Sequence, residues 1–192
     1  VRHWEEKDYL DLYDYAKENS EGFWRVEKFE RRTKNDATLA GYPSASLFSS
    51  TMNSSVANFY ETLGMRHSKV FYAFDGATAL TSAMLNVEYM FGETEKSMQN
   101  EASENYDKLY TAVAESGDIT LYHCNYTLPF GYVVPLDFQL SDSKGQDPLK
   151  VQNAMIKGLG IKDNLFTRAN TIRDDEELIL VADKDAYYYE IG

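Results

Sequence analysis

The sequence predicts an α+β fold in which short helices pack on a mainly antiparallel β-sheet. Several short stretches repeat apolar residues at helical spacing, and other stretches are rich in β-branched and aromatic residues. Turn residues separate neighbouring strand candidates, as in hairpins. Helices and strands alternate without the regular βαβ spacing that a parallel sheet requires. At 192 residues, the chain is long enough to bury a core without disulfide bonds.

The N-terminal region predicts one helix followed by one strand. A helix is expected from about Glu5 to Glu18, because apolar side chains recur at positions i, i+3, i+4 and i+7, namely Tyr9, Leu12, Tyr13 and Ala16. The segment "FWRVEKFE" (23–30) then alternates its side chains between two faces, which predicts a strand.

A hydroxyl-rich segment, residues 44–55, precedes the next helix. The helix is predicted from an apolar stripe made of Val56, Phe59, Tyr60 and Leu63. Asn53, Ser54 and Ser55 are good N-caps for it, and Gly64 is placed to end it in a left-handed conformation. The end of the hydroxyl run is therefore expected to cap the helix, and Gly41 to Ser46 is expected to be a turn-rich loop.

The middle of the chain predicts a strand, a helix and three further strands. "VFYAF" (70–74) is a strand, Asp75-Gly76 a turn, "ATALTSAML" (77–85) a compact helix, and "NVEYMFG" (86–92) a strand. Residues 93–105 are expected to be a loop or a fragment of helix. The segment 106–124 fits helical spacing in part, but Ser116-Gly117-Asp118 favours a hairpin with arms at 109–115 and 119–124. "FGYVVPLDF" (130–138) is interpreted as a strand that Pro135 ends or keeps at a sheet edge.

The C-terminal region begins with a polar loop over 141–147 and a strong helix start at Asp147-Pro148. That helix is expected to reach Gly158 or Gly160. An acidic turn at 174–177 precedes "LILVAD", and "AYYYEIG" is interpreted as a strand running to the last residue. We expect residues 1–192 to form a single domain that is truncated at both ends, with the start of a further β-rich subdomain at about 171–192.

The net charge of −12 argues against a nucleic-acid partner, because such binding depends on Lys and Arg side chains that neutralise phosphates. It equally disfavours laying the whole surface flat on anionic lipid. The one short basic cluster, Arg31, Arg32 and Lys34, lies among Glu27, Glu30 and Asp36 in the sequence. No run of apolar residues is long enough to cross a membrane. The single cysteine, Cys124, fits a reducing compartment or a bacterial exterior.

The sequence contains no clear motif for catalysis, for metal binding or for cofactor binding. There is no G-x-S-x-G elbow and no phosphate-binding loop, and the three histidines are too dispersed for a zinc motif. The loop hydroxyls are typical of turns and caps. We therefore expect no catalytic residue, no metal site and no cofactor in this chain. A hydrolase would need Ser, His and a carboxylate gathered within hydrogen-bonding distance.

Three stretches carry a resemblance to a known family. They are the segment from Phe23 to Gly64, the segment "TSAMLNVEYMF", and "CNYTLPFGYVVP" with the later "DPLKVQNAMIKGLG…LF". The last contains the signature residues Asn125, Leu128-Pro129, Gly131-Tyr132 and Gln152-Asn153. Read together, they resemble the extracytoplasmic region of the YfhO family of polytopic bacterial membrane proteins, over about residues 23–166.

The resemblance implies a role outside the cell membrane. Members of the family have many membrane-spanning helices with a glycosyltransferase-like arrangement that uses lipid-linked sugars, and some decorate cell-wall polymers such as lipoteichoic acid. The catalytic acid in such enzymes lies in a loop near the first membrane helices, outside this chain. The chain would then be a soluble outer domain on the extracytoplasmic face. Its partners would be the membrane-spanning portion of the same protein and a cell-wall glycopolymer.

The resemblance also yields candidate ligand-binding residues. The polar and aromatic candidates are Asn35, Asp36, Tyr42, Ser46, Ser49, Asn125, Tyr132, Gln152 and Asn153. Tyr42 and Tyr132 are available to stack on a sugar ring. Two functions remain open: an accessory domain that positions a polymer acceptor, and a purely structural or protein-interaction module with no ligand of its own.

Overall fold

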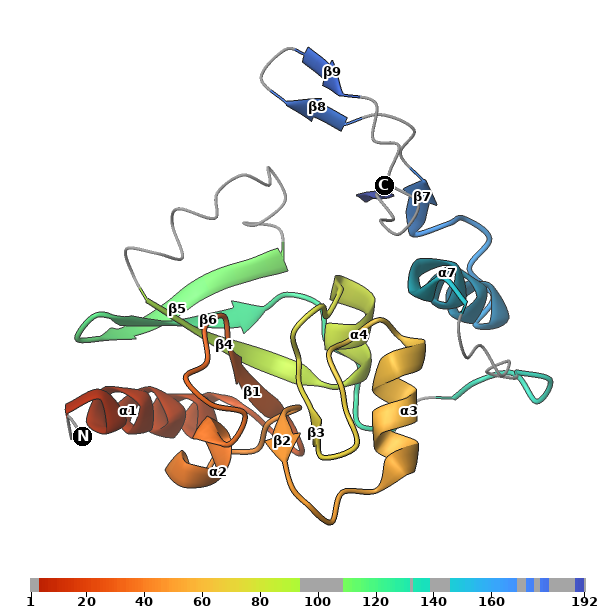
Figure 1. Cartoon of the computed structure of the whole chain (residues 1–192). Helices are drawn as coiled ribbons and strands as arrows, with labels where there is room; N and C mark the ends of the chain where they lie inside the picture. The colour runs from red at the N-terminus through yellow and green to blue at the C-terminus, as the bar shows by residue number, and fades with distance from the viewer. Residues whose placement is uncertain are drawn as a thin grey trace. The chain divides into compact units, whose positions relative to one another are not determined.

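A computed structural model describes residues 4–93, 109–131, 133–138, 146–168, 172–174, 177–179 and 189–191. Its elements confirm the predicted α+β class: short helices accompany a mainly antiparallel four-stranded sheet and small two-stranded sheets (Figure 1). The chain divides into two compact units, one of residues 1–60 and 65–132, the other of residues 61–64 and 133–192. The predicted domain organisation stays a prediction.

The first unit is built on a sheet with strand order β1-β4-β6-β5. The strands are β1 (Arg25–Lys28), β4 (Val87–Glu93), β6 (Ile119–Cys124) and β5 (Tyr110–Ser116). β4 pairs antiparallel with β6, and β6 pairs antiparallel with β5, so the predicted hairpin is confirmed. β1 pairs parallel with β4. The chain between these two strands must therefore cross over before it can return in the same direction.

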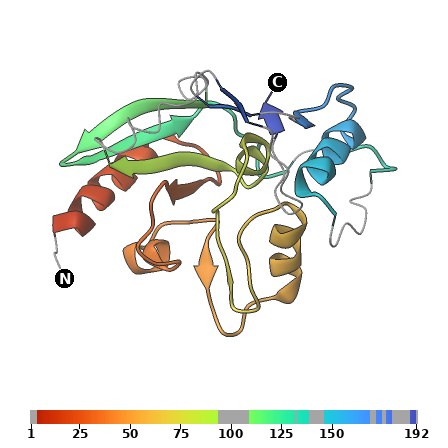
Figure 2. The same cartoon turned by 45° about the horizontal axis from the view of Figure 1, so that its top comes forward.

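Helix α1 (Trp4–Asn19) lies along one face of this sheet, as both views show (Figure 1 and Figure 2). Its predicted apolar stripe meets a buried cluster that includes Trp24, Val26, Phe91 and Leu121. The rings of Tyr9 and Phe91 meet edge to face with centroids 5.0 Å apart. Burial of this stripe supplies the main drive for the helix, because an isolated helix of this length is only marginally stable in water.

The crossover from β1 to β4 contains five short elements, of which the sequence predicted three. Those three are α3 (Ser54–Thr62), β3 (Phe71–Tyr72) and α4 (Ala79–Met84). The other two are α2 (Asp36–Ala40) and β2 (Leu47–Phe48), which pairs with β3. Both were missed because an element of five or two residues carries no readable periodicity.

Two predicted caps of α3 are confirmed. The Asn53 side chain accepts a hydrogen bond from the Ser55 N–H at 2.9 Å, and Gly64 takes a positive φ of 79° after the helix. A Cβ at position 64 would lie 2.7 Å from the Pro148 Cβ, so glycine is required both for space and for conformation.

The outer edge of β1 is partly covered by the chain that follows α2. The Val26 N–H donates to the Pro43 carbonyl oxygen at 2.9 Å. Gly41, with a φ of 81°, ends α2 in the left-handed conformation and turns the chain toward this contact.

The second unit contains α7 (Pro148–Gly158) and two strand pairs. β7 (Phe166–Arg168) pairs antiparallel with β10 (Tyr189–Ile191), and β8 (Ile172–Asp174) pairs antiparallel with β9 (Glu177–Ile179). The predicted start of α7 is confirmed, because the Asp147 side chain accepts from the Leu149 N–H at 3.0 Å.

One predicted strand is wrong. Within 130–138, the described residues form turns and irregular chain in place of a strand. Val133 and Leu136 are fully exposed. The alternating pattern in the sequence therefore does not correspond to a strand with one buried face. Residues 93–105 were predicted to be a loop or a fragment of helix; Glu93 is instead the last residue of β4, and 94–105 lie outside the described residues. Of the predicted loop 141–147, residues 141–145 also lie outside the described residues.

Candidate polar site around Glu27

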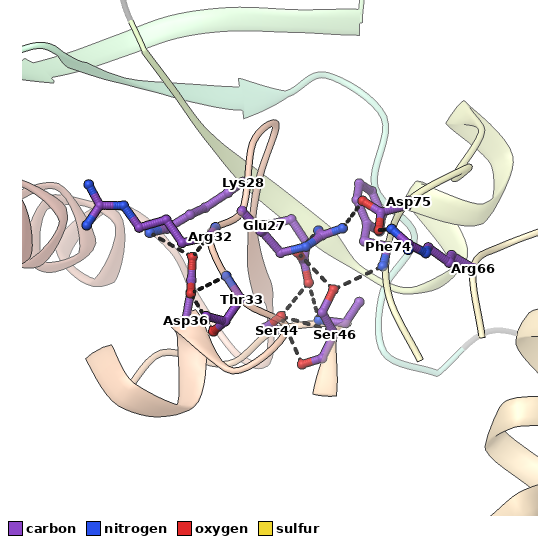
Figure 3. Close-up of polar contacts among 12 residues, drawn as sticks. Glu27, Lys28, Arg32, Thr33, Asp36, Ser44, Ser46, Arg66, Phe74 and Asp75 are labelled. Atoms are coloured by element: carbon purple, nitrogen blue, oxygen red, sulfur yellow. Dashed lines mark hydrogen bonds and ion pairs between the residues drawn. The ribbon is translucent and has the colours of Figure 1, made fainter. Parts of the chain in front are cut away.

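The first unit buries a carboxylate, Glu27, whose side chain is only 1% exposed. Its Oε1 accepts hydrogen bonds from the Ala45 N–H at 2.6 Å and from the Ser44 hydroxyl. Its Oε2 accepts from Arg31 Nη1 at 2.8 Å and from the Ser46 hydroxyl at 3.3 Å. Four donors thus converge on one carboxylate that has almost no access to water (Figure 3).

The network continues beyond Glu27. The second guanidinium nitrogen of Arg31, Nη2, is ion-paired with Asp75, and Arg66 Nη1 lies 3.8 Å from the other oxygen of Asp75. The Ser46 hydroxyl oxygen accepts from the Phe74 N–H at 3.0 Å. β1, the Ser44–Ser46 loop and the turn after β3 are therefore joined by side-chain hydrogen bonds.

Asp36 forms a second polar centre at the start of α2 (Figure 3). Its carboxylate accepts from the N–H groups of Arg32 and Thr33, both at 2.9 Å, and from the Thr33 hydroxyl at 2.7 Å. Lys28 Nζ lies 3.7 Å away. Burial raises the pKa of Asp36, but the hydrogen bonds from Thr33 and Arg32 and the charge of Lys28 outweigh it, so the pKa lies below its usual value.

Two buried tyrosines surround these carboxylates. The Tyr60 hydroxyl donates to the Ala45 carbonyl oxygen at 2.5 Å. Burial, followed by the negative charges of Glu27 and Asp36, raises the pKa of Tyr42 far above its usual value. Both phenols are neutral at physiological pH, and they act as packing and hydrogen-bonding groups.

This arrangement suits a structural role better than chemistry. A general base needs a lone pair directed at a substrate proton. Both oxygens of Glu27 are already occupied by protein donors, and the only charged donor, Arg31, is itself shared with Asp75. The site holds β1, the Ser44–Ser46 loop and the turn after β3 against one another, so these three segments would move only together.

The structure also brings a serine, a histidine and an acid near one another on the first unit. Glu88 is the extra residue of a β-bulge between β1 and β4, since Arg25 pairs with Val87 and Val26 with Tyr89. The Ser20 hydroxyl hydrogen-bonds Glu88 Oε1 at 2.9 Å, and His123 Nε2 lies 4.0 Å from the same oxygen. The hydroxyl thus faces the carboxylate and not the imidazole, which is not the geometry of an activated nucleophile.

The sequence-derived candidate residues are divided between the two units. In the first unit, Asp36, Tyr42 and Ser46 gather around the polar site. Asn35 bonds the backbone N–H and carbonyl of Phe48, at 2.8 and 3.2 Å, and so anchors β2. Ser49 bonds the Thr51 hydroxyl at 3.2 Å, which is a local turn contact.

The remaining candidates lie elsewhere. Asn125, at the end of β6, accepts from the Thr111 hydroxyl at 2.9 Å. In the second unit, buried Gln152 donates to the Leu63 carbonyl at 2.9 Å. Asn153 accepts from the N–H groups of Leu165 and Phe166, both at 2.9 Å, and donates to the Phe166 carbonyl at 2.7 Å. Tyr132 lies outside the described residues. Whether any of these side chains binds a ligand stays a prediction.

The residues at the centre of the network, Glu27, Arg31 and Ser44, were not among the candidates. The i, i+4 spacing of Glu27 and Arg31 was the one available signal, but this spacing indicates an ion pair on a helix and predicts no contact for a residue in a strand. The partners at 44–46 and 74–75 are distant in sequence, and only the fold reveals them.

None of the helices in the described part of the chain is long and apolar enough to cross a membrane. No group of three or more His, Cys, Asp or Glu side chains in the same part of the chain is arranged to hold a metal ion.

Comparison with known proteins identifies the family. No curated protein and no solved structure matches the chain. The family model described as "Bacterial membrane protein YfhO" matches residues 4–184. This match spans both units and nearly the whole sequence, including all three stretches that carry the resemblance. The chain therefore belongs to the YfhO family of bacterial membrane proteins.

Proposed function

We propose that this chain is an extracytoplasmic domain of a multi-spanning YfhO protein, and that it assists the transfer of lipid-linked sugars onto a cell-wall polymer such as lipoteichoic acid. In this proposal the domain holds the acceptor polymer, and the membrane-spanning portion of the same protein carries out the chemistry. Membership of a bacterial membrane-protein family supports the setting.

The observation that favours acceptor binding is an aromatic surface on the first unit. Phe130, 72% exposed, meets the ring of Phe23 edge to face with centroids 4.9 Å apart. The guanidinium of Arg25 lies 4.7 Å from the centre of the Phe23 ring, and Tyr126, four residues before Phe130 in the sequence, is also exposed. Exposed rings beside a hydrogen-bond donor suit the apolar face and the hydroxyl groups of a sugar.

This aromatic surface is held in place by the backbone. The Asn86 side chain donates to the Phe23 carbonyl, and Arg25 N–H donates to the Asn86 carbonyl at 2.8 Å. Asn86 takes a positive φ of 51°, a conformation that most side chains avoid. The Leu128 N–H donates to the Ala83 carbonyl at 3.1 Å and fixes the segment before Phe130. A preformed surface loses little entropy when a ligand binds.

Titration with lipoteichoic-acid fragments, followed by NMR, tests the proposal. We expect shifts at the amides around Phe23, Tyr126 and Phe130 at millimolar ligand, and loss of these shifts in Phe130→Ala. Leu39→Ala removes another exposed apolar side chain, from α2, and serves as the control. An absence of shifts at millimolar ligand would contradict acceptor binding.

The second candidate function is a structural or protein-interaction module that packs against the membrane-spanning portion. It is favoured by Asp36, Ser46, Gln152 and Asn153, whose side chains all bond within their own unit. Under this alternative, polymer fragments cause no shifts, and Phe130→Ala lowers the amount of intact full-length protein in the membrane relative to Leu39→Ala.

A further inference from the structure

One region of this strongly acidic chain is basic. The sequence has no acidic residue from Ala37 to Tyr60 and none from Met65 to Phe74, although the chain contains 31 Asp and Glu in total. These two stretches supply β2 and β3, which pair with each other. The loop before α2 adds Lys34, and the segment before β3 adds Arg66 and Lys69.

Two of these basic side chains, those of Lys34 and Arg66, lie near an aromatic pair. Phe48 and Phe71 are directly opposed in the β2–β3 register, so their side chains share one face of this small sheet. Lys34 Nζ lies 4.2 Å, and the Arg66 guanidinium 6.0 Å, from the centre of the Phe71 ring. Lys69 and Val70 continue the same edge, where the Val70 carbonyl accepts from the Ser49 N–H at 2.8 Å. We call Lys34, Phe48, Arg66, Lys69, Val70 and Phe71 the β2–β3 face.

The charges of this face are largely uncompensated. Among the described residues, Lys34 and Lys69 have no ion-pair partner, and the Arg66 side chain is 64% exposed beside Asp75 at 3.8 Å. By contrast, Arg31 is held at the interior by Glu27 and Asp75. Phe48 is 50% exposed, and Val70 is also exposed. Basic side chains around exposed apolar ones match an interface that is anionic at its surface and apolar beneath.

We propose that the β2–β3 face docks on the anionic headgroups of the membrane in which this family of proteins resides. The inference depends on the family and on the local charge, and not on the proposed sugar transfer. The net charge of −12 still opposes contact over the rest of the surface, so it orients the unit with this face toward the lipid. The hydroxyls of Ser49, Ser50 and Thr51 lie in the loop that follows β2 and would meet headgroup phosphates.

Vesicle sedimentation tests the proposal with the 192-residue chain. We expect binding to vesicles of phosphatidylglycerol and phosphatidylcholine, little binding to phosphatidylcholine alone, and weaker binding as salt rises. The test variant combines Lys34→Gln, Arg66→Gln and Lys69→Gln. Because each basic residue near an anionic surface contributes about fivefold to partitioning, the triple variant should bind about a hundredfold more weakly.

A matched control separates location from net charge. Lys150→Gln, Lys157→Gln and Lys162→Gln together remove the same three charges from exposed positions of the second unit. At about 0.15 M salt, where charges more than about 8 Å from the lipid are largely screened, this control should bind vesicles within about twofold of the unchanged chain. Urea unfolding of both triple variants should match the unchanged chain, which shows that each one folds.

Three results would overturn the proposal. The first is no binding of the unchanged chain to phosphatidylglycerol vesicles at low salt. The second is an equal loss in the two triple variants. The third is binding to soluble poly(glycerol phosphate) as tight as binding to vesicles, which would assign the face to free phosphate polymer. Failure here leaves the Phe130 experiment unaffected, because the two tests use different residues and different ligands.

Discussion

Replacement of Glu27 by glutamine tests whether the buried carboxylate holds the first unit together. Gln keeps one oxygen for the Ser44 hydroxyl and the Ala45 N–H. It places an NH₂ group against Arg31 Nη1, which now meets a donor at 2.8 Å in place of an acceptor. The Arg31 guanidinium, only 10% exposed, would keep Asp75 alone as its counter-ion. Breaking a buried ion pair in this way costs about 3–5 kcal/mol.

Urea unfolding measures this loss. Trp24 is buried in the core of the first unit, so its fluorescence reports on the unit that contains Glu27. With a slope of about 2 kcal/mol per molar urea, Glu27→Gln should lower the midpoint by about 2 M. The control is Glu115→Gln, which removes the same charge from an exposed position on β5 and should change stability by at most about 0.5 kcal/mol.

The outcome that refutes this reasoning is a small effect. If Glu27→Gln and Glu115→Gln unfold within about 1 kcal/mol of each other, the four donors around Glu27 do not stabilise the unit as a charged network. A large loss accompanied by an unchanged near-UV circular dichroism spectrum before unfolding would support the reasoning, because the native packing would then be intact.

Three further predictions concern other residues. Since the pKa of Asp36 is lowered in the fold, its contribution to the free energy of unfolding is complete above the unfolded pKa of about 3.9 and is lost as pH falls through the folded value. Asp36→Asn should therefore make the urea midpoint depend less on pH between about pH 5 and pH 2. Burial raises the pKa of the Cys124 thiol to about 12, so iodoacetamide should label it only after unfolding in urea, and labelling of the native chain at pH 8 would contradict its burial. Asn153→Ala removes three hydrogen bonds to Leu165 and Phe166 at the start of β7, which should cost about 2–3 kcal/mol and speed hydrogen exchange at these two amides, whereas unchanged exchange there would show that the asparagine does not hold the start of this strand.

Much of the fold could be predicted because its signals are local. The stripe of α1, the Asn53 cap of α3 and the Asp147 start of α7 each depend on residues within a few positions of one another. The β5–β6 hairpin is also local, since Gly117 takes a φ of 57° in the turn between its arms. For such elements, neighbouring residues are enough to predict the structure, although burial against the rest of the unit still stabilises it.

The polar site and the wrong strand show where local signals end. Ser46 and Phe74, which form a hydrogen bond, are 28 positions apart, and no local sequence pattern predicts this contact. The alternating residues of 130–138 are a strand pattern without a partner strand among the described residues. A pattern states which faces a segment could bury, whereas the rest of the chain decides whether it buries one.

The contact between Val26 and Pro43 has a consequence for the behaviour of this domain at high concentration. β1 lies at the border of its sheet, where unsatisfied amides invite a strand from another molecule. The Val26 amide is already occupied by its own chain, and proline has no amide to offer in return. Intermolecular strand addition at this border would first have to displace this loop, which forms no part of the sheet, from the Val26 amide.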